Sequence, residues 1–523
     1  MKKIINSTIK LLGVCWIAAS LYSCSDEALN KVNENNDHPK SVQSKYILAD
    51  VITSTAVHNI GGDLNTYFAA YVEHEVGIDN QLWRAETRQG EPSSSSTFNN
   101  PWSSLYSALR DARIAIDQCS KGGRDEGNTV TRGIAEVLAA YNSALITDMF
   151  GDAPWSEAAL IQPNGLPLYM TPKIDKQEDI YKGVINYLDA AITDLQGVDA
   201  GPGPIGNFDF LYKGDKAKWL KLAYGLKARY TLHLLARASN KAAEFDKILS
   251  YISKSFTSVD DQAAFNVYDA NNLNPLFDFY WSREGLAASE SMSEKLIERN
   301  DPRLRRVFVD AYWVQVDDPN ADNFFMAPNG TPEQLREYYN TSIFMYSQTA
   351  STMFLSYHEL LFIKAEVLAR KGDIATAENV LKEAVITGIA NAELSVDAAF
   401  NAPAVNDYGG LEETTDAISP EEAADYFDTE VKPLFDKNPL KEIMIQKYLA
   451  FFGASGESTE AYNDVRRLKA LGENFIVLAN PNKFPLRCGY GNSDTTTNPA
   501  VKEAFGNGQY VYSEPVWWAG GTR

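Results

Sequence analysis

The chain has 523 residues, 69 of them acidic and 48 of them Lys or Arg, so its formal net charge at pH 7 is −21. This acidic excess argues against nucleic acid as a partner and against direct adhesion to anionic lipid. Only four cysteines are present, which excludes a scaffold built on disulfides, and the length is ample for a large hydrophobic core.

The N-terminus has the pattern of a lipoprotein export signal. A basic start precedes an apolar run from Leu11 to Leu21 that is too short to span a bilayer as a helix. Leu21-Tyr22-Ser23-Cys24 then resembles a lipobox, which predicts a signal peptide over residues 1–23 and lipid attachment to Cys24. The alternative is an ordinary secretory signal with an incidental cysteine. Cleavage removes three lysines and no acid, which moves the net charge from −21 to −24.

An acidic run, Ser25-Asp26-Glu27, directly follows this cysteine. It resembles the surface-export signal of Bacteroidota lipoproteins, which implies the outward face of the outer membrane; a solvated acidic tether is the alternative. No later stretch reaches the ~20 apolar residues of a transmembrane helix. We therefore expect a chain that is anchored by lipid and does not span the membrane.

Helical periodicity dominates the rest of the chain, because apolar residues recur at three- and four-residue spacings. Asn100 and Asn438 each stand directly before a proline and are the expected N-caps of two helices. The helical stretches that we expect are 45–58, 64–76, 101–119, 129–150, 177–195, 216–235, 357–387 and 438–472.

No Pro/Ser-rich linker or charge block divides the chain, and Ser93–Ser96 and Gly201–Pro204 are expected to be surface connections. We expect one body over residues 24–523. Its helical scaffold lies mainly in 40–255 and 350–470, and its loop-rich lobe mainly in 256–350 and 470–523.

The stretch 357–387 resembles a tetratricopeptide unit. Ala365 lies on its first helix, Gly372 makes the turn, and Ala377 is the small residue at the helix crossing. Small residues at a crossing let two helices interlock, and the next unit buries the remaining face. Any antiparallel helical pair is the alternative. The expected fold is mostly α, with about four tetratricopeptide-like helical pairs and an irregular, loop-rich ligand-binding lobe.

Three motifs carry a wider resemblance. The run TDMFGDAPWSEA over 147–158 resembles the T-D-x-F/Y-G-D-x-P-Y/W-S/T-E-A signature of SusD/RagB-like outer-membrane lipoproteins. The stretch 442–467 resembles their E-I-x-x-Q-K-W/Y-x-x-x-F and N-D-x-R-R pattern, and 484–490 their P-x-R-x-x-Y block. After Tyr490 the chain departs from the family, with Gly-Asn-Ser-Asp where Pro-x-Ser/Thr-Glu is usual.

This resemblance implies a nutrient-binding partner of a SusC-like TonB-dependent transporter. Such a protein captures an oligosaccharide, or a peptide in some relatives, at the cell surface. It makes and breaks no bond and uses no cofactor, and its helical repeats form the scaffold that faces the transporter.

No strong catalytic motif is present. None of the five histidines forms H-E-x-x-H, no P-loop or G-x-G-x-x-G occurs, and 453–456 is not G-x-S-x-G. The chain has 69 acids, so pairs of carboxylates occur throughout and do not mark a catalytic site. A surface glycoside hydrolase with two distant carboxylates therefore stays as the alternative. The acidic loop Asp317–Asn323 lacks the spacing of an EF-hand, and we expect a solvated loop and no metal.

Aromatic residues in loops are the candidate ligand contacts, because they are not part of the apolar face that a helix buries in the core. A sugar ring presents C–H groups on its faces and hydroxyls at its edges, so it stacks on Trp or Tyr and bonds to polar side chains. The candidates are Trp83, Arg84, Tyr280, Trp281 and Trp313; for each, burial beneath a loop is the alternative.

Three further tryptophans and two adjacent arginines are assigned to the scaffold. Trp102, Trp155 and Trp219 start or end helices and are expected in the core. Arg466-Arg467 is expected to complement a helix dipole or to pair with the surplus acids. The sequence does not decide whether Cys119 and Cys488 pair.

Overall fold

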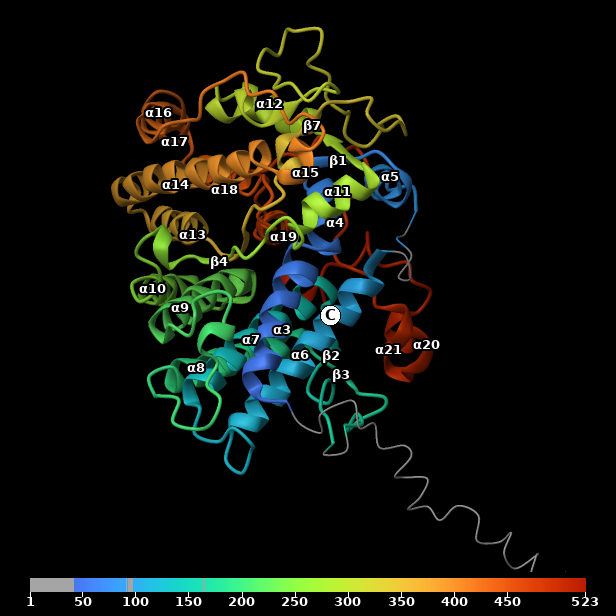
Figure 1. Cartoon of the computed structure of the whole chain (residues 1–523), viewed down its shortest axis with the longest axis vertical. Helices are drawn as coiled ribbons and strands as arrows, with labels where there is room; N and C mark the ends of the chain where they lie inside the picture. The colour runs from blue at the N-terminus through green and yellow to red at the C-terminus, as the bar shows by residue number, and fades with distance from the viewer. Residues whose placement is uncertain (1–41, 91, 93–96, 163–164) are drawn as a thin grey trace, which may run out of the picture. The chain divides into compact units, whose positions relative to one another are not determined.

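The computed structural model describes residues 42–90, 92, 97–162 and 165–523, and Gln43–Arg523 form one compact unit. The predicted signal peptide, Cys24, the acidic run after it and Ser93–Ser96 lie outside the described residues. Within them the chain is mostly helical and its strands are only two to four residues long, which confirms the predicted fold class (Figure 1). No helix in the described part of the chain is both long and apolar enough to cross a bilayer.

The first half of this unit is a stack of long helices, drawn in blue to green in Figure 1. Successive helices pack against one another, α6 on α7, α7 on α8, and α9 on α10. The central α7 is buried along nearly its whole length, because Ala135, Ala139 and Ala140 let its neighbours approach closely. The helices are α3 (Ser44–Ser54), α6 (Asn99–Cys119), α7 (Thr129–Phe150), α8 (Gln177–Asp194), α9 (Lys216–His233) and α10 (Lys241–Ile252).

The second half contains the predicted tetratricopeptide-like pair, α13 (Tyr357–Lys371) and α14 (Ile374–Phe400). Gly372 ends α13 in the left-handed region at φ 87°, where its N–H bonds back to the carbonyls of the last turn. Ala365 and Ala377 are fully buried between the two helices. The helical pair is confirmed, although α14 continues to Phe400 and is longer than the unit predicted over 357–387. Both helices pack on α18 (Pro439–Ala450), which α19 (Ser458–Ala470) follows.

In the described part of the chain, eight short strands form four antiparallel pairs. One pair corrects the sequence prediction: the helix expected over 64–76 ends as α4 (Asp63–Tyr71), and a strand follows it. Glu73 has φ 65°, which breaks the helix, and the strand then pairs with a distant segment. The pairs are β1 (Glu75–Gly77) with β5 (Leu286–Ala288), β2 (Ala153–Pro154) with β3 (Ile174–Asp175), β4 (Ala263–Phe265) with β8 (Thr352–Leu355), and β6 (Phe308–Val309) with β7 (Thr341–Ser342).

The segment between β4 and β8 holds short helices joined by irregular chain, with α5 (Asn80–Thr87) beside it through the β1–β5 pair (Figure 1). Its helices are α11 (Pro275–Arg283), α12 (Glu290–Ile297), η6 (Pro302–Arg305) and η7 (Ile343–Tyr346). The remaining short elements are η1 (Thr55–Ile60), η3 (Gly206–Phe208), η4 (Leu234–Arg237), η5 (Val259–Asp261), α15 (Pro403–Asn406), α16 (Pro420–Tyr426), η8 (Phe427–Val431), α17 (Lys432–Lys437), α20 (Asn492–Thr497), α21 (Pro499–Phe505) and η9 (Trp517–Ala519).

The residues of the sequence motifs meet in a buried network that joins α7, α8, α9 and α19. Asp148 accepts a hydrogen bond from the hydroxyl of Tyr181 and lies 3.3 Å from Nδ1 of His233. Nε2 of His233 lies 3.0 Å from Oε2 of Glu460. Burial alone would lower the pKa of His233, but the carboxylates of Glu460 and Asp148 raise it to about 9. The motif residues therefore hold the scaffold together.

The two adjacent arginines of α19 belong to the same core. Arg466 donates to the carbonyl of Asp148 at 2.8 Å, and Arg467 pairs with Glu366 at 2.7 Å and with Asp464 at 2.8 Å. Both guanidinium groups are buried inside the fold. Of the two predicted roles, pairing with acids is confirmed for Arg467, which also lies in the last turn of α19.

Among the other local predictions, some are confirmed and one is wrong. Asn438 caps α18 by accepting from the N–H of Lys441, as expected, but α6 begins at Asn99, so Asn100 is not its cap. Trp102 and Trp219 are buried as predicted, and Trp155 is partly buried. Cys119 and Cys488 are both buried free thiols, which settles the question that the sequence left open.

Candidate ligand-binding surface

Tyr280 and Trp281 lie on α11 and not in the loop that the sequence suggested. Asn274 fixes this short helix: its Oδ1 accepts from the N–H of Leu276 at 2.9 Å, while its Nδ2 donates to the carbonyls of Ala350 and Ala454. Aromatic and polar residues that carry no clear helical stripe hid this helix from periodicity. Its tertiary hydrogen bonds make α11 a rigid platform for two aromatic rings.

Trp313 projects from a tight turn after β6. Asp310 holds the turn by accepting from the N–H groups of Tyr312 at 2.9 Å and Val314 at 3.1 Å. Trp313 itself has φ 65°, a strained conformation for a bulky residue. A backbone held in this way points to a constraint on where the indole must lie.

The predicted residues of α11 and Trp313 come together in a series of rings. Ring centroids are 6.2 Å apart between Trp281 and Trp313, 5.9 Å between Trp281 and Tyr408, and 5.7 Å between Trp313 and Tyr346. Phe277 also stacks on Trp281, with ring planes only 16° apart. We call Tyr408, Trp281, Trp313 and Tyr346 the aromatic series.

A cavity of about 70 Å³ opens beside this series. Burial raises the pKa values of Tyr280, Tyr339 and Tyr346, so their hydroxyls stay protonated and available for hydrogen bonds. Three of its wall residues are acidic and none is basic. The cavity is lined by Tyr280, Trp281, Glu284, Asp310, Ala311, Trp313, Glu337, Tyr339, Thr341 and Tyr346.

Trp83 and Arg84 lie apart from these residues, on α5, where they line a second cavity of about 290 Å³. Nε1 of Trp83 donates to the carbonyl of Pro332 at 3.0 Å, and Arg336 forms an ion pair with Asp79 at 2.6 Å. The segment 330–339 is thus fastened to α5 at one end and supplies Glu337 and Tyr339 to the first cavity at the other. The five predicted residues therefore line two separate cavities, Tyr280, Trp281 and Trp313 the first and Trp83 and Arg84 the second.

Sequence reasoning missed several side chains of this surface. Tyr339 and Tyr346 lie in stretches rich in aromatics, where nothing in the local pattern separates a cavity wall from core. Tyr408 did carry a signal, since it stands before Gly409-Gly410 in a turn and is 76% exposed. Glu284, Asp310 and Glu337 could not be selected from 69 acids by spacing alone.

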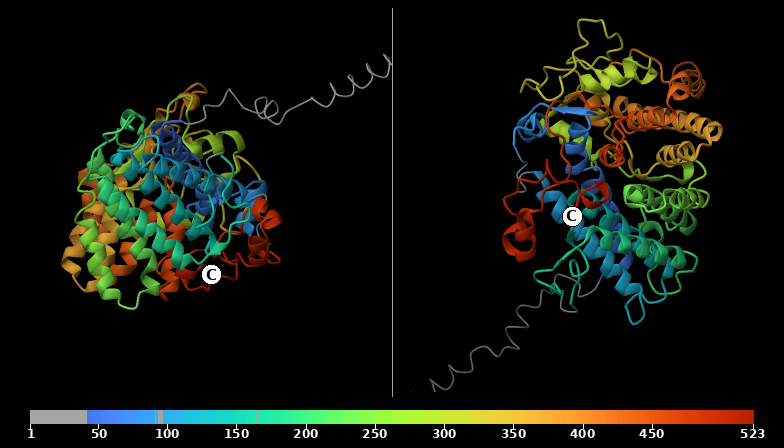
Figure 2. Two further views of the ribbon diagram at one scale, coloured as in Figure 1. Left: turned by 90° about the horizontal axis from the view of Figure 1, so that it is seen from below. Right: turned by 180° about the vertical axis from the view of Figure 1, so that it is seen from behind.

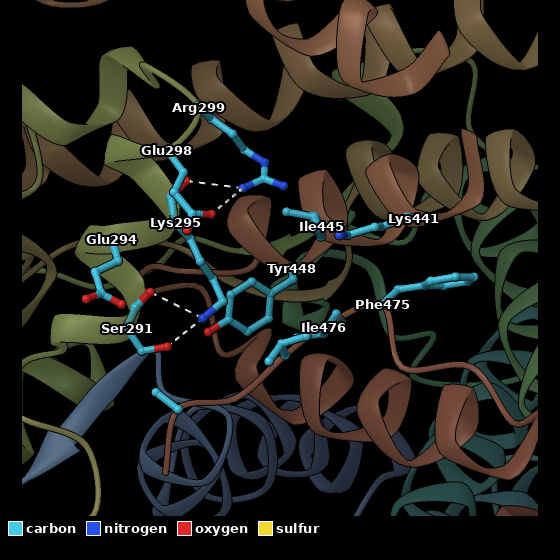
Figure 3. A pocket seen from close by; sticks show the side chains of 12 residues that line it. Ser291, Glu294, Lys295, Glu298, Arg299, Lys441, Ile445, Tyr448, Phe475 and Ile476 are labelled. Carbon is cyan, nitrogen blue, oxygen red and sulfur yellow. Dashed lines mark hydrogen bonds and ion pairs between the residues drawn. The ribbon is translucent and has the colours of Figure 1, made fainter. Parts of the chain in front are cut away.

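A third cavity, of about 300 Å³, contains none of the predicted residues. It lies between α12, α18 and the irregular segment 475–479 (Figure 3). Three of its five charged side chains are already engaged: the ammonium group of Lys295 donates to Ser291, Arg299 pairs with Glu442 at 3.2 Å, and Glu298 lies 3.6 Å from Arg299. Burial lowers the pKa of Lys295. This cavity offers few free groups for a ligand.

In the described ranges no group of three or more His, Cys, Asp or Glu side chains is arranged to hold a metal ion. In the acidic loop 317–323, Asp318 accepts from the backbone and side chain of Asn320, which makes it a local turn.

Comparison with known proteins identifies the family. Residues 36–490 match the SusD-like family model, described as starch-binding associating with outer membrane. A comparison with curated proteins finds no match. A solved SusD/RagB family protein from Bacteroides thetaiotaomicron is 56% identical, with 92% of this chain and 100% of that chain covered and a TM-score of 0.87.

Two more distant structures share the fold. A chitin-binding protein is 21% identical at a TM-score of 0.66, with 90% of this chain and 99% of that chain covered. A SusD homolog from Bacteroides fragilis is 18% identical at a TM-score of 0.69, with 91% of this chain and 100% of that chain covered. The match to the family model spans most of the sequence, and the chain belongs to the SusD-like family of nutrient-binding proteins that associate with the outer membrane.

Proposed function

We propose that this protein is a cell-surface lipoprotein that captures an oligosaccharide on the aromatic series and passes it to a SusC-like TonB-dependent outer-membrane transporter. The observation that carries the proposal is the series of rings itself, which borders a cavity lined by hydroxyls and carboxylates. Membership of the SusD-like family supports the transport role.

The chemistry of this surface suits a sugar. Aromatic faces stack on the C–H face of a pyranose, while side-chain oxygens accept hydrogen bonds from its hydroxyls. Tyr408 and Tyr312 are 76% and 88% exposed, so a ligand reaches them without unfolding. Trp281 already contacts Phe277 and Trp313 before any ligand arrives, and such preorganisation lowers the entropic cost of binding.

The second cavity gives a longer ligand another contact. Trp83 and Arg84 line it, and the segment 330–339 connects it to the first cavity through Pro332 and Tyr339. We propose that an oligosaccharide follows this segment from the aromatic series toward Trp83. Peptide cargo would use the same surface with a different balance of hydrogen bonds.

Lipid attachment to Cys24 remains part of the proposal and rests on the lipobox. Replacing Cys24 by Ser should abolish incorporation of labelled fatty acid and release the protein from the membrane fraction. Retention of label in Cys24→Ser would contradict the assignment.

Calorimetric titration of the protein without its first 24 residues tests the capture step. Oligosaccharides and short peptides are compared, and Trp281→Ala should weaken saccharide binding at least about tenfold. Tyr169→Ala is the matched control, because Tyr169 is an exposed aromatic outside both cavities. Binding of peptides alone would change the cargo, and release of shortened saccharide would favour the hydrolase.

A further inference from the structure

The small cavity beside the aromatic series has an unusual combination of walls. Five aromatic residues line it together with Glu284, Asp310 and Glu337, and no lysine or arginine does. The acids come from three separate segments: the end of α11, the turn after β6, and the segment 330–339. In an acidic protein a group of acids is ordinary, but their convergence on a cavity walled by rings is not explained by surface charge.

Two of the acids are free to meet a ligand. Asp310 already accepts from Tyr312, Val314 and Asn323. Within the described residues, Glu284 and Glu337 accept no hydrogen bond and form no ion pair. The neighbouring cations are engaged elsewhere, because Arg336 pairs with Asp79 and Arg283 lies over the ring of Phe279 at 5.5 Å.

The backbone holds these groups at a cost. Glu284, Trp313 and Glu337 have φ values of 48°, 65° and 55°, and they are three of the nine non-glycine residues with positive φ in the described part of the chain. Side chains other than glycine rarely adopt this region. Such strain concentrates at ligand sites, where the surrounding structure determines it. Three strained residues on the wall of one cavity indicate that the cavity is built for a ligand.

The volume limits what can enter. About 70 Å³ is far below the ~300 Å³ and more of pockets that enclose a whole ligand, and a water molecule takes roughly 30 Å³. The cavity therefore admits a substituent of a sugar and not its ring, which stacks on the exposed rings outside. Carboxylate and sulfate substituents are repelled by the acids. A protonated amine is attracted by the carboxylates and by the faces of the rings together.

We propose that this cavity holds the protonated primary amine of a saccharide, so that the preferred cargo is an oligosaccharide with free amino groups. Glu284 and Glu337 supply the countercharge, and Trp281 and Trp313 supply the ring faces. The inference rests on the proposed capture of oligosaccharide at the aromatic series. It adds to that function the class of sugar that the aromatic series and its cavity prefer.

Three oligosaccharides with the same β-1,4 backbone test the inference: the hexamers of glucosamine, of N-acetylglucosamine and of glucose. Calorimetric titration at pH 5.5 and low salt keeps the amines protonated. We expect the glucosamine hexamer to bind about tenfold or more tightly than either neutral hexamer, and we expect this ratio to fall as salt is added, because a charge-assisted contact is screened.

The double variant Glu284→Gln/Glu337→Gln should bring that ratio close to one. The matched control is Glu294→Gln/Glu298→Gln, which changes the net charge equally at the third cavity and should keep the ratio. Equal affinity for all three hexamers, or a ratio unchanged in the first double variant, overturns the inference while the capture function stands. Binding of no saccharide, with lysine-containing peptides bound instead, overturns the capture function as well.

Discussion

At the scale of single residues, the fold depends on a few buried charges that join distant parts of the chain. Arg467 contacts Glu366 on α13 and Asp464 on its own helix, and neither Arg467 nor Glu366 is exposed. Burial alone would raise the pKa of Glu366, but Arg467 and Arg370 hold it well below its usual range. Buried ion pairs are costly to break because the remaining charge loses its partner.

Replacing Arg467 by Met should therefore lower the free energy of unfolding by about 3–5 kcal/mol. Urea unfolding followed by circular dichroism measures this change. Lys432→Met is the control, since Lys432 pairs with Glu378 and Asp436 at the surface and its loss should move the midpoint little. If both variants lost the same free energy of unfolding, the buried ion pairs of Arg467 would contribute no more to stability than the surface pairs of Lys432.

At the scale of elements, the sequence predicted what periodicity can reveal. The helices expected over 129–150 and 177–195 are confirmed within one residue, because an apolar stripe repeats over many turns. The short helices α5 and α11 were expected as loops, since each has too few turns to show a stripe and depends on tertiary hydrogen bonds.

The residues of the candidate surface were likewise predictable from sequence only in part. Trp281 and Trp313 were named from the sequence because aromatics in irregular chain are conspicuous. Their partners Tyr346 and Tyr408 were not, because ring contacts between segments this far apart in sequence follow from the fold alone. The separation of Trp83 into a second cavity was hidden for the same reason.

Asn274 connects stability and binding in one element, α11. Asn274→Ala removes the cap and leaves the buried carbonyls of Ala350 and Ala454 without a donor. We expect a loss of about 2–3 kcal/mol in stability and weaker saccharide binding, because Trp281 loses its platform. Unfolding curves and titrations measure the two effects.

Two comparisons separate the roles of Asn274. Asn274→Asp keeps the cap acceptor but turns a buried carboxylate oxygen toward the carbonyls of Ala350 and Ala454, so it should cost at least as much stability as Asn274→Ala. Ser419→Ala removes an exposed cap of α16 and should cost about 1 kcal/mol without any change in binding. Wild-type affinity in Asn274→Ala would show that α11 positions Trp281 without this residue.

At the scale of the whole molecule, buried titratable groups limit stability on both sides of pH 5–6. Below this range, protonation of Glu366 and Glu460, whose pKa values are lowered on balance by buried cations, removes their ion pairs. His74 is buried and its pKa is lowered to about 3, so acid favours the unfolded state in which it takes up a proton.

Above this range three groups act in the opposite direction. Burial raises the pKa of Glu86 to about 7 and that of Glu136 to about 8, so the unfolded state loses these protons more readily as pH rises. His233, with a pKa of about 9 against 6.5 for the free side chain, stabilises the fold fully below 6.5. Its contribution is lost as pH rises through 9.

Between pH 6.5 and pH 9, His233 gives the largest step of these three groups, about 3 kcal/mol. Urea unfolding across this interval should show the decline. His233→Gln should reduce it to the smaller part that comes from Glu86 and Glu136, because the imidazole no longer titrates. Nuclear magnetic resonance of the wild-type imidazole, which should titrate near pH 9, measures the same coupling without a substitution. An imidazole that titrates near 6.5 would mean that Asp148 and Glu460 do not hold a cation, and the network that joins α7, α9 and α19 would then require neutral hydrogen bonds.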